Sequence, residues 1–76
     1  MFVSKGKLLN LSRKEVEDLT LGKIVRINLS DGSNADIIVR AILPESFHPD
    51  VFFGFISSEG KYYNIPVIDS VEIHNI

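Results

Sequence analysis

The chain of 76 residues contains no cysteine and no tryptophan, and it has only two histidines. Without cysteine it can form neither a disulfide nor a thiolate metal site, and it has no thiol nucleophile. Neither His48 nor His74 stands in a spacing typical of a zinc site, so we expect no bound metal. The five glycines are scattered singly, which disfavours a phosphate-binding loop for ATP or a dinucleotide. We therefore expect no cofactor and no small-molecule substrate.

Long apolar runs and a strong charge of one sign are also missing. No apolar run approaches the length that a bilayer requires, and residues 1–9 do not form a signal peptide, so we expect a cytoplasmic protein with no membrane contact. Residues 1–40 carry seven basic and five acidic side chains, whereas residues 41–76 carry one and five. A net charge of −2 argues against a non-specific nucleic-acid binder, although it permits a small local basic patch.

Apolar residues, in contrast, are plentiful for so short a chain. They make up 45% of it, with a mean hydropathy of +0.16. The length allows a single domain, residues 1–76, and a domain of this size buries only roughly 60% of the surface that its unfolded chain exposes. The excess apolar content favours a surface that another copy or a partner protein covers.

One short helix is predicted near the N-terminus. Ser12 and Glu15 form the capping-box pattern S-R-K-E, which predicts a helix over residues 12–19. Residues 1–10 have apolar ends around a Lys-Gly-Lys centre, and either a leading strand or a flexible arm fits them.

Two strands joined by a tight turn follow the helix. Val25, Ile27 and Leu29 alternate with polar residues, and Asp31-Gly32 is a strong hairpin-turn signal. The next run, ADIIVRAIL, predicts a long strand with one face formed by Ala35, Ile37, Val39, Ala41 and Leu43.

Three further strands are predicted after a loop that contains Pro44 and Pro49. In VFFGFISS the residues Val51, Phe53 and Phe55 share a face, and in KYYNIPV the residues Tyr63, Ile65 and Val67 do. Residues 68–70 then indicate a corner, and residues 71–73 a last strand. A chain with one short helix and five short antiparallel strands can protect its sheet edges by closing into a small β-barrel, and this is the fold we expect.

The residues with catalytic potential have simpler explanations. His48 beside Asp50 could act as a general base, but the same loop is equally a polar turn, and nothing nearby supplies an oxyanion hole. Asp69 and Glu72 fit a corner and a solvated strand position. We therefore expect the protein not to be an enzyme.

Aromatic residues are concentrated in the C-terminal half. Phe52 and Phe53 must point to opposite sides of a strand, as must Tyr62 and Tyr63, so one face of this hairpin is exposed or covered by another chain. Such a face suits base stacking, a protein interface, or a second small core against the N-terminal segment.

The order of helix, Leu21-Gly22-Lys23, strand, Asp31-Gly32 and long strand resembles the opening of Sm-like proteins, and residues 65–73 are similar to their closing strands. This resemblance implies an SH3-like or Sm-like barrel and an oligomer that binds single-stranded RNA. The family's acidic-to-Asn motif is missing around residues 43–51, and Pro66-Val67 replaces its Arg-Gly pair, so no base-binding residue carries over. The Asp31-Gly32 turn between two strands and the closing segment, residues 65–71, are also similar to the Rof family of acidic inhibitors of the termination factor Rho, and this resemblance implies a barrel that binds a protein.

Two functional hypotheses follow. The first is a regulatory or adaptor module that binds a protein partner or itself through Phe52, Phe55 and Tyr62, with Arg40 and Lys61 at the rim. The alternative is an Sm-like oligomer that binds single-stranded RNA through the basic side chains of Lys5, Lys7, Arg13 and Lys14.

Overall fold

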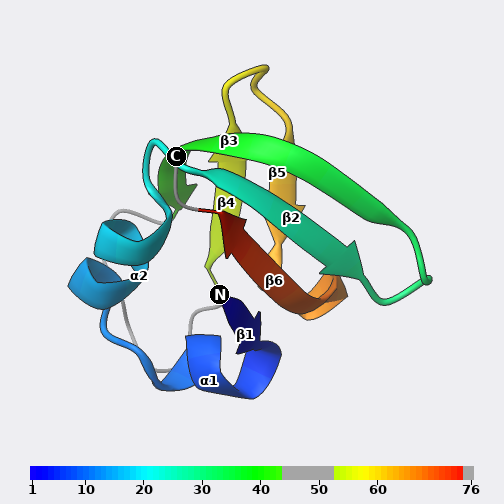
Figure 1. Ribbon diagram of the computed structural model, residues 1–76, viewed down its shortest axis with the longest axis horizontal. Coiled ribbons are helices and arrows are strands. Elements are labelled where there is room, and N and C mark those ends of the chain that lie inside the picture. Colours follow the sequence, from blue (N-terminus) through cyan, green and yellow to red (C-terminus); the bar gives the residue numbers. More distant parts are fainter. Residues whose placement is uncertain (44–52, 75–76) are drawn as a thin grey trace.

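The computed structural model describes residues 1–43 and 53–74, whose strands form one antiparallel sheet in the order β1-β6-β2-β3-β4-β5 (Figure 1). The elements in chain order are β1 (Phe2–Ser4), α1 (Lys5–Asn10), α2 (Arg13–Thr20), β2 (Ile24–Leu29), β3 (Asn34–Leu43), β4 (Gly54–Ser57), β5 (Tyr62–Asn64), the 3₁₀ turn η1 (Ile65–Val67) and β6 (Ile68–His74). The expected mainly-β, antiparallel fold is confirmed. The expected counts of five strands and one helix were wrong, because the described residues form six strands and two helices. In this order β1 and β5 are the two edges, so the sheet is not closed.

The additional strand and helix both lie in the N-terminal segment. Phe2 of β1 pairs with Glu72 of β6. Ser4 then caps α1 by accepting a hydrogen bond from the Lys7 N–H. Val3 and Leu8 are fully buried. Residues 1–10 are therefore part of the fold, and a flexible arm is not what they form.

Helix α2 begins where the sequence predicted. Ser12 and Glu15 make both hydrogen bonds of the capping box, each at 3.2 Å. Val16 and Thr20 are buried, and the Thr20 hydroxyl donates to the Val16 carbonyl at 2.7 Å. Figure 1 shows both helices together at one side of the curved sheet.

The β2–β3 hairpin also forms as predicted, with Gly32 at a positive φ of 89° in its turn. The predicted face of β3 is wrong after Val39, however. A β-bulge at Arg40 places Ala41 rather than Arg40 opposite Ile56, and the buried residue that follows is Ile42. Because a bulge adds one residue to a strand, the alternation restarts and Ala41 and Leu43 lie on the face opposite Val39.

The corner before the last strand lies three residues earlier than predicted. It is the 3₁₀ turn η1, where Pro66 lacks the N–H that a strand would need. Val67 is consequently exposed instead of sharing the buried face of Tyr63 and Ile65. Strand β6 is a single run from Ile68, paired with both β1 and β2.

The core lies on the concave side of the sheet and under the helices. Phe53 and Phe55 are its largest fully buried side chains, and their rings meet edge to face with centroids 5.6 Å apart. The remaining buried apolar side chains are Val3, Leu8, Val16, Val25, Ile27, Val39, Ile42, Tyr63, Ile65, Ile68, Val71 and Ile73. Among the described residues, no helix has the length and apolar character needed to span a membrane.

Candidate functional site

The inner face of the β4–β5 hairpin belongs to the core. Phe55 is 0% exposed and pairs with the buried Ile42 of β3. The prediction that Phe55 lies on a partner-binding surface was therefore wrong. Phe52 and Phe55 are three residues apart, so a regular strand would point them to opposite faces. Phe52 itself lies outside the described residues, as do Phe47, His48 and Asp50.

The outer face of the same hairpin carries Tyr62, which is 46% exposed. Its ring lies over Gly54, where an added Cβ would overlap the Cε1, Cζ and Oη atoms of Tyr62. The Tyr62 hydroxyl donates to the Asn64 side-chain oxygen at 3.3 Å. Because Gly54 has no side chain, the ring packs directly against the backbone at that position. The opposite face of the ring is open to contact.

Other apolar side chains lie on the same side of the sheet. Ile56 pairs with Tyr62 on one side and with Ala41 on the other, and Leu43 lies opposite Gly54. We call Ala41, Leu43, Ile56 and Tyr62 the hairpin outer face; the first three are half-buried. The bulge leaves Arg40 exposed next to Ala41.

Lys61, which was predicted at the rim of the partner-binding surface, lies beside the ring of Tyr63. Its ammonium group is 5.3 Å from the centroid of the Tyr63 ring. The Lys61 N–H donates to the buried Ser57 hydroxyl at 3.1 Å. Of the four predicted partner-binding residues that the structure describes, Tyr62 lies on the hairpin outer face and Arg40 lies next to its member Ala41 in the chain, whereas Phe55 and Lys61 lie elsewhere.

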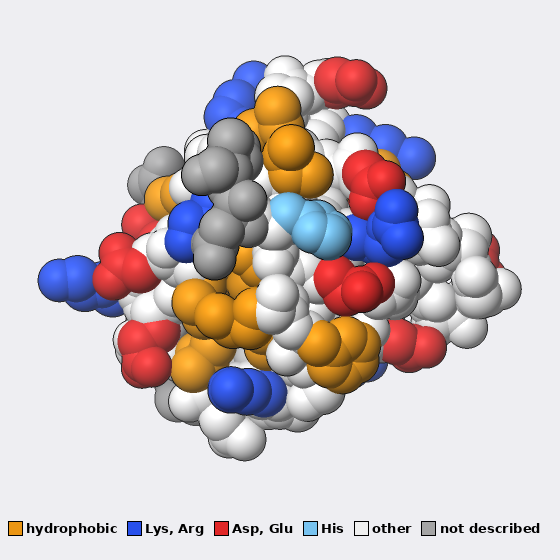
Figure 2. Space-filling model, viewed as in Figure 1, with side chains coloured by type: hydrophobic (Ala, Val, Ile, Leu, Met, Phe, Trp, Pro, Cys, Tyr) orange, Lys and Arg blue, Asp and Glu red, His pale blue; other side chains and the backbone are white. Residues whose placement is uncertain are grey.

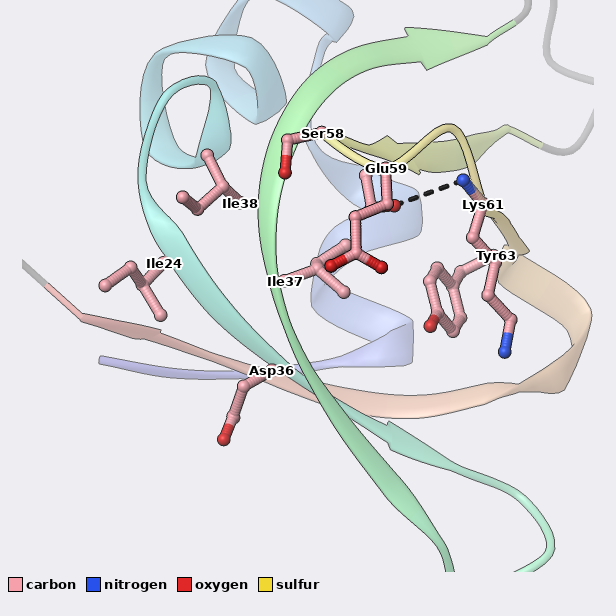
Figure 3. A pocket seen from close by; sticks show the side chains of 9 residues that line it. Ile24, Asp36, Ile37, Ile38, Ser58, Glu59, Lys61 and Tyr63 are labelled. Carbon is pink, nitrogen blue, oxygen red and sulfur yellow. Dashed lines mark hydrogen bonds between the residues drawn. The ribbon is translucent and has the colours of Figure 1, made fainter.

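A pocket of about 350 Å³ opens between β3 and the turn that joins β4 to β5. Figure 3 shows Ile24 and Ile38 on one side of β3, and Ile37 and Tyr63 on the other. Asp36, Ser57, Ser58, Glu59 and Lys61 complete its lining. This pocket was not predicted from the sequence. The one sequence feature that would have indicated the pocket is Ile38, an apolar residue on the half-polar face of β3.

One charged residue of the pocket lining, Asp36, is paired with Arg26 of β2. The guanidinium of Arg26 donates to the carboxylate of Asp36 at 2.8 and 3.2 Å. These hydrogen bonds lower the pKa of Asp36 and raise that of Arg26. Figure 2 shows apolar and charged side chains interspersed over the sheet on this side of the molecule. Such pairing suits a solvated surface, and it leaves neither group poised as a general acid or base.

The four basic residues of the RNA hypothesis fall into two groups. Lys5 donates to the Pro66 carbonyl at 3.2 Å, and Arg13 contacts Glu17 at 2.7 Å and the Ile42 carbonyl at 3.0 Å. Lys7 and Lys14 are exposed on different helices. Arg13 thus links α2 to β3, and Lys5 links α1 to the turn η1.

The two acidic residues considered for catalysis have different surroundings. Asp69 is exposed on β6, whereas Glu72 accepts a hydrogen bond from the Asn28 amide at 3.3 Å. Within residues 1–43 and 53–74, no three histidine or acidic side chains are grouped so as to hold a metal ion.

The chain matches no protein-family model, no curated protein and no solved structure. The resemblances to Sm-like and Rof-like proteins therefore stay predictions.

Proposed function

We propose that the protein is a non-enzymatic regulatory or adaptor module that binds a protein partner, or a second copy of itself, through the hairpin outer face. In this proposal the curved sheet is a small barrel of the SH3-like or Sm-like type, and the protein works in the cytoplasm. The observation that carries the proposal is the ring of Tyr62, which lies over Gly54 and is 46% exposed.

An exposed tyrosine whose ring packs on a glycine has the properties of an anchor residue in a protein interface. Tyrosine offers a large flat area with few rotatable bonds, and it is enriched among the residues that dominate binding energy. The ring of Tyr62 is already held against the sheet and by Asn64, so little conformational freedom remains to be lost on binding. Ile56 and Leu43 extend the apolar area next to it.

The position of Tyr62 on an edge strand adds a second source of affinity. Among the described strands, β5 pairs only with β4, so its other edge can offer backbone hydrogen bonds to an incoming strand. Arg40 supplies a cation at the margin of the apolar patch, a place where charge favours correct orientation more than affinity.

The test uses three variants of the same surface. Tyr62→Ala removes the ring. Gly54→Ala displaces the ring, because the added Cβ would overlap it, and Tyr62→Phe keeps the ring as the matched control. Light scattering after size exclusion gives the native mass, and retention of proteins from a lysate reports a partner. We expect Tyr62→Ala and Gly54→Ala to abolish either self-association or retention, while Tyr62→Phe preserves it.

Circular dichroism must show that all three variants remain folded. If the wild-type protein is a monomer and all variants retain the same proteins as the wild type, the hairpin outer face is not the binding surface. Loss of folding in Tyr62→Ala would instead assign Tyr62 to the core.

The alternative of single-stranded RNA binding receives no specific support from the positions of its basic residues. Lys5 and Arg13 are engaged within the chain, and Lys7 and Lys14 lie on separate helices.

A further inference from the structure

Strand β3 has one neighbouring strand along each half of its length, and the two neighbours lie on opposite sides of it. It pairs with β2 from Asn34 to Ile38, whereas its pairing with β4 begins at Val39. The Ser58 N–H still donates to the Ile38 carbonyl at 2.9 Å, and the chain then turns away toward Gly60. No described strand lies along the edge of β3 formed by residues 34–37.

The backbone groups on this edge point into the pocket. Val39 exchanges hydrogen bonds with Gly22 and Lys23, on the side of β2. Successive residues of a strand direct their N–H and C=O groups to opposite sides, so those of Asp36 and Ile38 face the other way. The N–H and C=O of Asp36 and the N–H of Ile38 are thus presented at the opening.

The side chains around this edge form two apolar walls. Figure 3 is a view onto the edge of β3, with Ile24 and Ile38 on one side of the strand and Ile37 and Tyr63 on the other. A strand added at this edge would direct alternate side chains to the two walls. The volume of about 350 Å³ lies in the range of small ligand-binding sites and admits a short stretch of chain.

We propose that this pocket is a second binding site, separate from the hairpin outer face, and that it takes an extended peptide segment of a partner protein. The segment adds as a strand to β3 at Asp36 and Ile38, in line with β4. One of its side chains packs against Ile37 and Tyr63, and the next packs against Ile24 and Ile38. The recognised chemistry is an uninterrupted peptide backbone with two neighbouring apolar side chains.

Charge favours a partner peptide over a second copy of this chain. Two copies paired through β3 about a two-fold axis at Asp36 would place the two Asp36 carboxylates opposite each other in the joined sheet. Like charges opposite each other in a sheet are destabilising. The pocket offers a small ion no strong site either, because Asp36 is paired with Arg26 and Lys61 lies beside the Tyr63 ring.

The test first selects peptides that bind the protein and then determines which of their amide N–H groups are needed for binding. Peptides are selected from a random phage-displayed library against the full chain, and the best binder is synthesised together with two N-methylated forms. In each form the methyl groups block alternate amides, so only one form loses the N–H groups that face β3. We expect that form to bind at least about tenfold more weakly, the effect of losing one or two hydrogen bonds, while the other binds almost normally.

Amide hydrogen exchange and chemical shifts locate the peptide. We expect slower exchange at the N–H groups of Asp36 and Ile38 when it is bound. Ile38→Lys should weaken binding, because Ile38 is 47% exposed and forms one wall of the pocket. The matched control is Leu9→Lys, which makes the same change at a residue 45% exposed on α1 and outside the pocket, and it should bind the peptide normally.

Three outcomes would overturn the proposal: selection yields no binder, the two N-methylated peptides bind equally, or the affected amides lie around Tyr62 instead of along β3. The last outcome would support the function proposed for the hairpin outer face, so the two proposals fail separately.

Discussion

The two faces of the β4–β5 hairpin differ in what covers them, although both carry apolar side chains. On the inner face, Phe53, Phe55 and Tyr63 are covered by the core. On the outer face, Tyr62 packs only on Gly54 and its neighbours and stays half open. Two adjacent tyrosines thus differ in role: burial of Tyr63 stabilises the fold, whereas Tyr62 keeps an exposed ring, through which we propose that a partner binds.

The strongest way to break this comparison is to remove one ring from each face. Phe55→Ala should lower the free energy of unfolding by about 3–5 kcal/mol, because it empties a fully buried site, and a domain this small would then be largely unfolded. Tyr62→Ala should cost about 1 kcal/mol or less, because the ring is already half solvated. Urea unfolding measures both. Equal losses would show that the two faces are equivalent.

A smaller effect is expected at the end of the hairpin, where Lys61 lies by the ring of Tyr63. Lys61→Met keeps most of the side-chain length but removes the cation, and it should lower the free energy of unfolding by about 0.5–1 kcal/mol. Lys61→Arg is the matched control and should retain the stability. If Lys61→Met is as stable as the wild type, the contact of this cation with the inner tyrosine contributes nothing.

The ion pair on the outer side of β2 and β3 should have a smaller effect still, visible only in acid. Hydrogen bonds from Arg26 lower the pKa of Asp36 below its ordinary value of 3.8. The charged carboxylate therefore stabilises the folded state above that value, and this contribution is lost as the pH falls through the lowered pKa. Asp31 behaves in the same way through its hydrogen bonds from Ser33.

Thermal unfolding as a function of pH tests this expectation. Asp36→Asn should flatten the decline of stability below about pH 4, and added salt should reduce the difference because the pair is exposed. Asp69→Asn, an exposed carboxylate on β6, serves as the comparison. The same acid dependence in wild type and Asp36→Asn would mean that the pair has no effect on folding.

The smallest effect is expected for the binding of single-stranded RNA to the protein. A single-stranded oligouridylate should bind more weakly than about 100 µM even at low salt, because two of the four basic residues are engaged within the chain. Fluorescence anisotropy at several salt concentrations measures this. Tight binding that weakens steeply with salt, and that Lys14→Ala impairs, would favour RNA binding over the protein-binding proposal.

Elements with strong local signals could be predicted from the sequence. The capping box at Ser12 and the turn at Gly32 depend on a few neighbouring residues, and α2 and the β2–β3 hairpin form where expected. Helix α1 was missed because its six residues give less than two turns of apolar pattern, and only Leu8 of them is buried. Its stability comes from packing against β1 and β6, which lie far apart in the sequence.

The candidate sites could be predicted only in part. Alternation correctly separates Tyr62 from Tyr63, but it does not say which of the two faces inward. The packing of the Tyr62 ring depends on Gly54, which lies eight positions earlier in the chain. The β3 pocket joins Ile24, Ile38 and Tyr63, and no local pattern links three segments that meet only through the sheet.

The bulge at Arg40 has a consequence for how β3 tolerates insertions and deletions. Val39 and Ile42 face the core with two residues between them, and omission of Arg40 leaves a regular alternation with the same residues inside. A deletion of Arg40 should therefore straighten the strand without changing the composition of the core. A deletion before the bulge, of Ile38 for example, would invert one arm of the strand, so the bulge marks a place where β3 can change its length at little cost.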